Sequence, residues 1–486
     1  MSLRLSRATL AALPAAIARP AVDPAALRTG IVHLGIGAFS RAHLAAYTAP
    51  LLGRDPGWGI LGASLRSADT RDALAAQDWL YAIVERDGAG ARIAIPGALT
   101  GILVAPESPA ALVARLADPG VRIVTMTVTE KGYCRDTGAD ALNEADPAIR
   151  HDLAHPEAPR SMPGLIVAAL AARRAAGIAP FTVLSCDNLA ANGVATGRVI
   201  ARFAALRDAD LGRYVAGEVA FPCSMVDRIV PATTAEDRAA TDAALGMADA
   251  WPVIGEPFRQ WVIEDRFPTG RPAWEETGAE LVADVRPYED MKLRLLNCSH
   301  SAIAYLGQLA GWHSVADAMA APALPRFIAA LMGECATTLH MPPGVDVDGY
   351  CAALRDRFAN PALRHRTAQI AMDGSQKLPQ RLFAPALDRL RGGARAPAMA
   401  LAAAAWLLFL RGKAEDGSAL ALDDPRAAEL RAAAAGAGDA RGLRDAVFSL
   451  PGLVPPELAA SVAFGEEVRA ALETLMRAGV AAALAL

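Results

Sequence analysis

The sequence lacks the features that mark several classes of protein. Its six cysteines are widely spaced and form no C-x-x-C pair, which argues against a zinc ribbon, an iron–sulfur centre or a disulfide framework and favours a reducing, cytoplasmic setting. The 48 Lys and Arg residues nearly balance the 52 Asp and Glu residues, and no block of like charge is present. We therefore expect a small molecule as the partner, and neither nucleic acid nor a membrane surface.

Long apolar segments are also absent. The N-terminus has no extended apolar stretch before Pro14, so no signal peptide for export is predicted. The most apolar stretch, Ala396 to Leu410, contains Pro397 and is shorter than the roughly 18 to 20 residues that cross a bilayer. We expect this stretch to form a buried helix.

Length and patterning predict two parts. At about 150 residues per domain, 486 residues suggest two or three domains. After about Asp284, long Ala- and Leu-rich helical stretches dominate. We predict an α/β domain over residues 1–284 and a mostly α-helical domain over residues 285–486, connected by a segment rich in Pro, Trp and charge, 256–287. The α/β prediction depends on apolar strands that alternate with helical stretches, as in a parallel sheet: 31–34, 58–65, 121–128 and 181–185.

A glycine turn follows the first predicted strand. The segment Gly35 to His43 reads G-I-G-A-F-S-R-A-H. In a dinucleotide-binding turn, Gly35 would permit the tight bend and Gly37 would let the backbone approach a pyrophosphate at the helix N-terminus. Ser40 stands where the G-x-G-x-x-G pattern has its third glycine. The turn is therefore compatible either with cofactor binding or with a purely structural role.

A second motif, M-K-L-R-L-L-N-C-S-H, has helical apolar spacing and contains Lys292, Asn297 and His300. At about 100 degrees per residue, Glu289, His300 and Asn297 lie roughly 60, 80 and 140 degrees from Lys292, so all four can share one helix face. Oxidation of a secondary alcohol by hydride transfer needs a group that accepts the hydroxyl proton and donors that hold the developing oxyanion. This face offers such groups, unless the charged residues face solvent and His300 is an ordinary core histidine.

A third element, S-C-D-N-L-A-A-N-G, follows the strand predicted at 181–185 and contains Asn188. In open α/β sheets, ligands bind at the carboxyl ends of the strands. Asp187, Asn188 and Asn192 can equally form a turn and cap the next helix.

Together these segments resemble the polyol-specific long-chain dehydrogenases, the mannitol dehydrogenase family, which also includes D-arabinitol dehydrogenases and fructuronate reductase. The resemblance covers nearly the whole chain, and K-x-x-x-x-N-x-x-H is its most specific motif. It is also carried by I-V-H-L-G-I-G-A-F-S-R-A-H, S-C-D-N, E-P-F-R-Q-W-V-I-E-D and L-R-H-R-T-A-Q-I-A-M-D-G-S-Q-K-L-P. It implies a Rossmann-type N-terminal domain, a mostly α-helical C-terminal domain and a site in the cleft between them.

The resemblance also implies roles for individual residues in a zinc-independent hydride transfer, and therefore no metal site. Lys292 would be the catalytic base. Asn188 and Asn297 would form the oxyanion hole, and His300 would bind and orient the substrate. Two acids complete the implied site, Glu289 in proton passage between solvent and the lysine and Asp227 in contact with the substrate.

The expected cofactor is NAD, because much of the family uses it, and NADP is the alternative. After the second strand, Asp69 is placed to bind a ribose hydroxyl of NAD, whereas Arg66 is placed to hold the additional phosphate of NADP. The glycine turn supplies the other residues of the expected cofactor site, Gly35, Gly37, Phe39 and Arg41.

The expected reaction is that of an NAD-dependent polyol 2-dehydrogenase, which interconverts mannitol and fructose, in a monomer or small homo-oligomer. D-arabinitol or sorbitol is an alternative polyol. Fructuronate reductase (D-mannonate oxidoreductase) is the alternative activity, because Lys131 in E-K-G-Y resembles that side of the family. A sugar acid would need a fixed cation for its carboxylate, and Arg366, Lys377 and Arg381 are candidates unless they are solvated or paired with Asp373.

Overall fold

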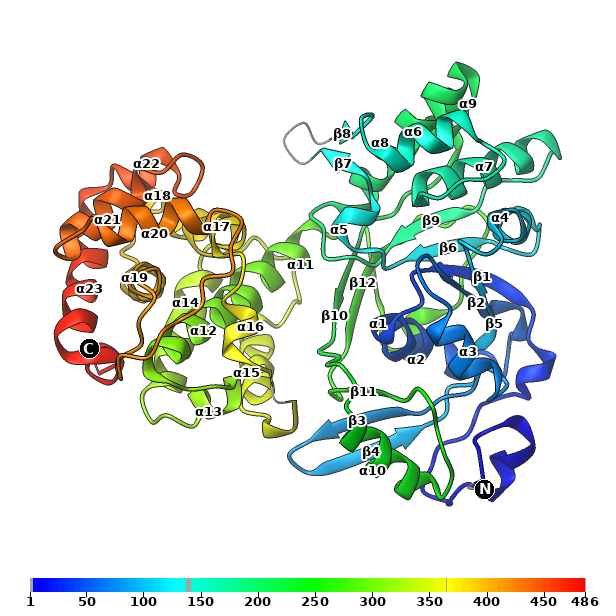
Figure 1. Ribbon diagram of the computed structural model, residues 1–486, viewed down its shortest axis with the longest axis horizontal. Helices are drawn as coiled ribbons and strands as arrows, with labels where there is room; N and C mark the ends of the chain where they lie inside the picture. Colours follow the sequence, from blue (N-terminus) through cyan, green and yellow to red (C-terminus); the bar gives the residue numbers. More distant parts are fainter. Residues whose placement is uncertain (1–2, 137–140, 364, 486) are drawn as a thin grey trace. The chain divides into compact units, whose positions relative to one another are not determined.

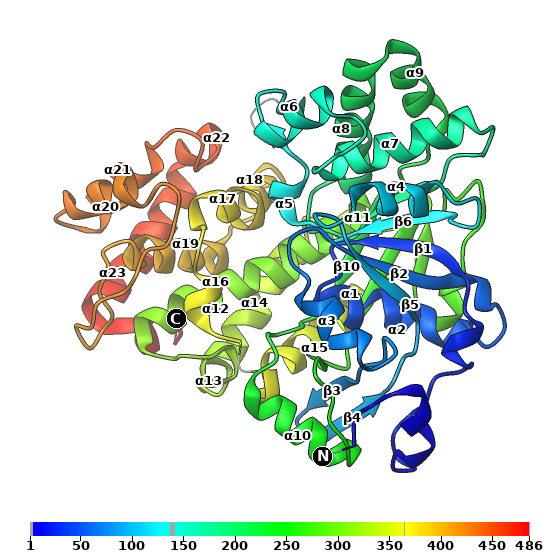
Figure 2. The same ribbon diagram turned by 45° about the vertical axis from the view of Figure 1, so that its right-hand side comes forward.

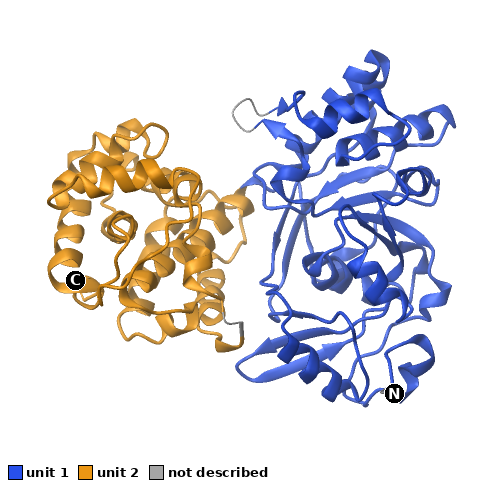
Figure 3. Ribbon diagram, in the orientation of Figure 1, with its two compact units in different colours: residues 1–286 blue, residues 287–486 orange. Residues whose placement is uncertain are grey.

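The chain folds into two compact units, residues 1–286 and 287–486, which Figure 3 shows in different colours. The computed structural model describes residues 3–136, 141–363 and 365–485.

Unit 1 is organised around a five-stranded sheet whose neighbouring strands are all parallel (Figure 1). The chain adds strands on one side of β1 and then returns to add strands on the other side, so the strand order reverses between β1 and β6. This is the switch point at which dinucleotide-binding sheets hold their ligand. The α/β, Rossmann-type prediction is therefore confirmed. In spatial order the strands are β5 (Leu99–Val104), β2 (Gly59–Ser64), β1 (Thr29–Leu34), β6 (Ile123–Met126) and β9 (Thr182–Ser185).

Helices and a second sheet bury both faces of this sheet, which explains why its strands are continuous apolar runs without polar alternation. On β1, Val32 and Leu34 pack against one set of helices, whereas Ile31 packs against the other layer. The first face is covered by α4 (Pro109–Ala117), α7 (Met162–Ala175), α8 (Asn192–Arg207) and α9 (Ala209–Glu218), as Figure 2 shows. The second face is covered by α1 (Ala38–Ala42), α2 (Leu44–Thr48), α3 (Asp69–Ala75) and a small sheet.

The segment 256–287, predicted to connect the two parts, instead belongs largely to the core of unit 1. It contributes β12 (Gln260–Glu264) and β13 (Glu280–Val282) to the small sheet, in which β12 pairs with β10 (Ser224–Asp227) on one side and with β13 on the other. Trp261 and Trp274 are fully buried, with ring centroids 4.6 Å apart. The prediction was wrong because Pro and charge content suggested a linker, while the two indoles bury large apolar surfaces against the main sheet. A third sheet contains β11 (Val253–Gly255), β3 (Ile83–Asp87) and β4 (Gly90–Ala94).

The regular secondary-structure elements in the described residues of unit 2 are all helices, which confirms the predicted mostly α-helical C-terminal part. The helix α19 (Pro397–Phe409) lies at its centre, almost wholly buried, and packs against α12 (Cys298–Ala310), α14 (Leu324–Ala336) and α23 (Val462–Ala483) (Figure 1). The Glu334 carboxylate accepts hydrogen bonds from the Ala398 and Met399 N–H groups, which satisfies two donors at the start of α19.

The apolar stretch expected to be a buried helix is therefore confirmed as one. Among the residues that the structure describes, no helix combines the length and the apolar character that crossing a membrane requires.

Candidate active site

The glycine turn lies at the carboxyl end of β1. Gly35 has a φ of +90°, and a Cβ there would lie 2.1 Å from the carbonyl oxygen of Thr127, so only glycine fits. Gly37 precedes α1 and is exposed, and the nearest atom that its Cβ would meet is 3.8 Å away. The space in front of Gly37 is thus open to a ligand, next to the first N–H groups of a helix.

The other residues predicted to contact the cofactor differ in their surroundings. Phe39 stacks on His43, with ring centroids 4.9 Å apart. Arg41 is buried, and its guanidinium donates to the carbonyl oxygens of Gly37 and Trp251, so it supports the turn from within the protein. Burial lowers the pKa of Arg41 to about 10. Arg66 and Asp69 are both exposed after β2, where the ribose end of a dinucleotide lies in this fold.

Asp187 organises the loops that follow β6 and β9. Its carboxylate accepts hydrogen bonds from the Val128 and Thr129 N–H groups, at 3.0 and 3.1 Å, and from the Tyr133 hydroxyl at 2.8 Å. Burial raises the pKa of Asp187. Thr129 has a φ of +62°, an unusual conformation for a β-branched residue that these bonds help to hold. Sequence reasoning treated Asp187 only as a turn residue.

Asn188 and Asn192 have different environments within the same loop. Asn188 is exposed directly after Asp187, at the carboxyl end of β9. Asn192 is fully buried: its amide group donates to the carbonyl oxygens of Ser185, Asp187 and Ser224 and accepts from the Ser224 N–H. The structural alternative therefore applies to Asn192, whereas Asn188 presents its side chain at the surface of the sheet edge.

Asp227 is the last residue of β10 and is buried, opposite Gln260 of β12. The neighbouring Arg228 is an interior ion-pair residue, with its guanidinium 2.6 Å from Glu85 and bonded to the carbonyl oxygen of Glu256. Arg228 thus has a structural role within unit 1.

In unit 2, the helix predicted over Met291 to Leu309 is not a continuous α-helix. The π-helix η6 (Lys292–Asn297) separates α11 (Arg286–Met291) from α12. Because its hydrogen bonds join residues five apart, a turn takes roughly 4.4 residues and each residue advances about 82 degrees. Asn297 therefore lies about 50 degrees around the axis from Lys292, and not the roughly 140 degrees of an α-helix. The π-helix brings the amide closer to the lysine's face.

Glu289 and His300, which were predicted to share a helix face with Lys292, lie on the flanking helices α11 and α12. Lys292 is buried, 9% exposed, while Glu289 on α11 and Asn297 are half-buried. His300, 7% exposed, packs against Phe358 with ring centroids 4.5 Å apart. The buried Nε2 of His300 has no hydrogen-bond partner among the described residues. It is therefore available to a ligand hydroxyl.

Positive charge surrounds His300. Burial, followed by the nearby His365, Arg357 and Arg381, lowers its pKa well below the usual value, so the imidazole is neutral. His365 lies edge-on to it at 5.3 Å. Arg381 belongs to a second π-helix, η8 (Pro379–Phe383), which contacts η6, and it donates to the Ser301 hydroxyl at 3.3 Å.

Lys377 and Arg366, the other two cations predicted to bind a substrate carboxylate, have different surroundings. Lys377, on α17 (Gly374–Leu378), donates to the carbonyl oxygen of Met372 at 2.7 Å and lies 3.6 Å from the Asp373 carboxylate. This is the ion pair that the sequence left open. Burial lowers the pKa of Lys377. Arg366 is exposed at the start of α16 (Thr367–Ile370).

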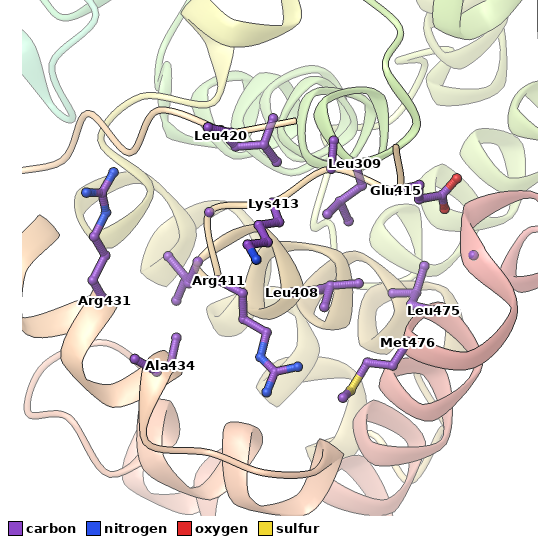
Figure 4. A pocket seen from close by; sticks show the side chains of 16 residues that line it. Leu309, Leu408, Arg411, Lys413, Glu415, Leu420, Arg431, Ala434, Leu475 and Met476 are labelled. Atoms are coloured by element: carbon purple, nitrogen blue, oxygen red, sulfur yellow. The ribbon is translucent and has the colours of Figure 1, made fainter. Parts of the chain in front are cut away.

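A cavity of about 970 Å³ lies elsewhere in unit 2 (Figure 4). It is bounded by the ends of α12 and α19, by α20 (Ala427–Ala435) and by α23, and Arg411 and Lys413 point into it. None of the predicted site residues lines it, so it is separate from the candidate active site.

A parallel sheet with a glycine turn at its switch point, in a chain that also carries a buried lysine, an amide and a neutral imidazole on two consecutive helical segments, defines a class: nicotinamide-dependent oxidoreductases that act on CH–OH groups. The family models agree. Residues 29–276 match the Rossmann domain of mannitol dehydrogenase, and residues 284–476 match its C-terminal domain. The chain belongs to the mannitol dehydrogenase family, which confirms the resemblance, and it is an oxidoreductase.

Relatives with several activities are similar to the chain along almost its whole length. D-mannonate oxidoreductase of Escherichia coli K12 is 43% identical over 95% of this chain and 96% of its own. Mannitol 2-dehydrogenase of Phaeosphaeria nodorum is 40% identical over 96% of this chain and 82% of its own.

Two solved structures share the fold. Pseudomonas fluorescens mannitol 2-dehydrogenase in ternary complex with NAD and D-mannitol is 38% identical, with a TM-score of 0.85 and 99% of each chain covered. A D-sorbitol dehydrogenase in substrate-free form is 33% identical, with a TM-score of 0.92 and coverage of 99% of this chain and all of that one.

Proposed function

We propose that this protein is an NAD-dependent polyol 2-dehydrogenase that interconverts mannitol and fructose, with Lys292 as the general base. The observation that carries the proposal is the burial of Lys292 on the π-helical segment that also bears Asn297 and leads directly into the helix of the neutral His300. The relatives named for mannitol 2-dehydrogenase and the solved complex with NAD and D-mannitol support this choice.

The proposed mechanism assigns a task to each group. NAD, when bound, accepts the hydride from the carbinol carbon. Lys292, which is buried, accepts the hydroxyl proton, a step that requires its neutral amine. Asn188 and Asn297 donate hydrogen bonds to the developing oxyanion, and His300 orients a neighbouring hydroxyl. Glu289, half-buried one helical turn before the lysine, passes the proton on to solvent.

In the proposed site, the glycine turn and the residues after β2 bind the cofactor. Gly35 and Gly37 present the backbone to the pyrophosphate, with Phe39 and Arg41 behind the turn. Asp69 would hold the ribose hydroxyls of NAD. Arg66, beside it, keeps NADP as the second candidate cofactor.

A specific observation favours a second substrate class. Arg357 and Arg381 both act on His300 electrostatically. Such cations suit a sugar acid, because mannonate carries a carboxylate where mannitol has a terminal hydroxymethyl group. The similarity to a D-mannonate oxidoreductase points in the same direction.

A substrate panel tests the choice. With NAD, we expect kcat/KM for mannitol to exceed the value for D-mannonate by at least about tenfold, because removing the mannonate carboxylate from water without a matched cation costs more than about 1.4 kcal/mol, the equivalent of a tenfold change. Initial rates of NADH formation on mannitol, sorbitol, arabinitol and mannonate, repeated with NADP, measure this. The reverse preference, abolished by Arg381→Gln, would identify the sugar acid as the substrate.

We expect the reaction to be independent of metal ions, because a lysine replaces the metal-bound group that ionises the alcohol in zinc-dependent enzymes. After dialysis against EDTA, the rate of mannitol oxidation should stay within experimental error of the untreated rate. Loss of activity that zinc restores would contradict the lysine mechanism.

A further inference from the structure

A buried chain of hydrogen bonds reaches the glycine turn from inside the sheet. His33 on β1 is fully buried and joins two hydroxyl groups: its Nδ1 lies 2.8 Å from the Thr125 hydroxyl, on β6, and its Nε2 lies 3.0 Å from the Thr127 hydroxyl. The Thr127 hydroxyl is also 3.0 Å from the carbonyl oxygen of Gly35. The chain crosses between β1 and β6 at the point where the strand order reverses.

Only one arrangement of protons satisfies this chain. The Gly35 carbonyl can only accept, so the Thr127 hydroxyl donates its single proton to it and must accept from His33 Nε2–H. Burial lowers the pKa of His33 to about 4, so near neutral pH the ring is neutral and carries one proton. Its Nδ1 is then an acceptor, and the Thr125 hydroxyl donates to it. The chain therefore has a defined direction that ends at the glycine turn.

The Gly35 carbonyl is held by two donors on opposite sides of the turn. Besides the Thr127 hydroxyl, it accepts the Gly37 N–H at 2.7 Å. A carbonyl dipole that rotated toward an incoming pyrophosphate would repel it, whereas the N–H groups at the start of α1 attract it. A restraint on the Gly35 carbonyl therefore stabilises the conformation in which the turn offers donors to an anion.

We propose that His33 and Thr127 are positioning residues for the dinucleotide, and that the Thr127 hydroxyl sets NADH affinity through the Gly35 carbonyl. The proposal rests on the proposed function in one respect, that the cofactor binds at this turn. Neither residue needs to touch the cofactor. Loss of the hydroxyl should therefore weaken cofactor binding without slowing the chemical step.

Paired substitutions at Thr127 test the proposal. Thr127→Val keeps the shape and removes the donor, and we expect the dissociation constant of NADH to rise about tenfold, as loss of one buried hydrogen bond of roughly 1.4 kcal/mol predicts. Thr127→Ser restores the donor and should stay within about twofold of the unaltered protein. With saturating NAD, kcat of both variants should change less than about twofold. Quenching of tryptophan fluorescence by NADH and steady-state rates measure these quantities.

Thr182→Val provides the matched control. Thr182, on β9, is more deeply buried than the half-buried Thr127, but its hydroxyl has no hydrogen-bond partner among the described residues, so the same substitution should leave NADH affinity unchanged. If Thr127→Val proves too unstable to study, His33→Gln and His33→Leu replace it: glutamine keeps an N–H donor near the Nε2 position and should bind NADH more tightly than leucine.

The outcomes separate the two proposals. An unaltered protein that fails to bind NADH would overturn the proposed function. An unaltered protein that binds NADH, with equal affinity in Thr127→Val or in both His33 variants, would overturn the positioning role alone.

Discussion

The substitution Lys292→Ala is expected to lower kcat for mannitol oxidation at least about a hundredfold while leaving NADH affinity nearly unchanged. The reason is that general-base catalysis contributes roughly two to four orders of magnitude, and alanine cannot accept the hydroxyl proton. In the proposed mechanism the glycine turn binds the cofactor, whereas the lysine acts on the substrate hydroxyl, so cofactor affinity should not depend on the lysine. Rates at saturating NAD and titration with NADH separate the two effects.

A matched lysine controls for general effects of the substitution. Lys413 is exposed in the cavity shown in Figure 4 and lies outside the proposed site, so Lys413→Ala should keep full activity. Equal kcat values for Lys292→Ala and the unaltered protein would remove the lysine from the mechanism.

The second large effect is expected in the loop after β9, where two asparagines should respond in opposite ways. Asn188→Ala should lower kcat about a hundred- to a thousandfold, as loss of one oxyanion donor does in other enzymes, with little change in stability because the side chain is exposed. Asn192→Ala should instead lower the free energy of unfolding by about 2 to 4 kcal/mol, because it leaves several buried backbone groups unpaired.

Urea denaturation and kcat of the folded protein distinguish these two variants. Asn192→Ala should retain most of its kcat below the unfolding transition. A stable Asn188→Ala protein with unchanged kcat would show that Asn188 takes no part in oxyanion stabilisation.

Local sequence signals were sufficient to predict the layers of the fold. The apolar runs at 31–34 and 181–185 became buried strands of the main sheet, because burial on both faces of a parallel sheet demands such runs. The glycine spacing after the first run placed the turn. The Ala-rich stretch at 396–410 became the central helix α19 for a similar reason: its small apolar side chains suit a position surrounded by other helices.

Predictions from composition were wrong where residues far apart in the chain pack against each other. Trp261 and Trp274 lie in a segment with the polar and proline content of a linker, and only their burial against the main sheet makes it part of the core. The calculation of helix angles likewise did not predict the π-helix η6. One additional residue in a turn does not change the apolar spacing of so short a segment in a recognisable way.

The amino-acid sequence by itself determined the class of fold and the types of groups available for chemistry, since strand hydrophobicity and short motifs are local properties. The tertiary structure alone decided which of those groups have structural partners. It showed that Asn192 and Lys377 are engaged within the protein, and that Asp187 and His33 reach across neighbouring strands to the loops of the sheet edge. Hydrogen bonds between residues far apart in the chain require both partners in place, and no local pattern encodes that.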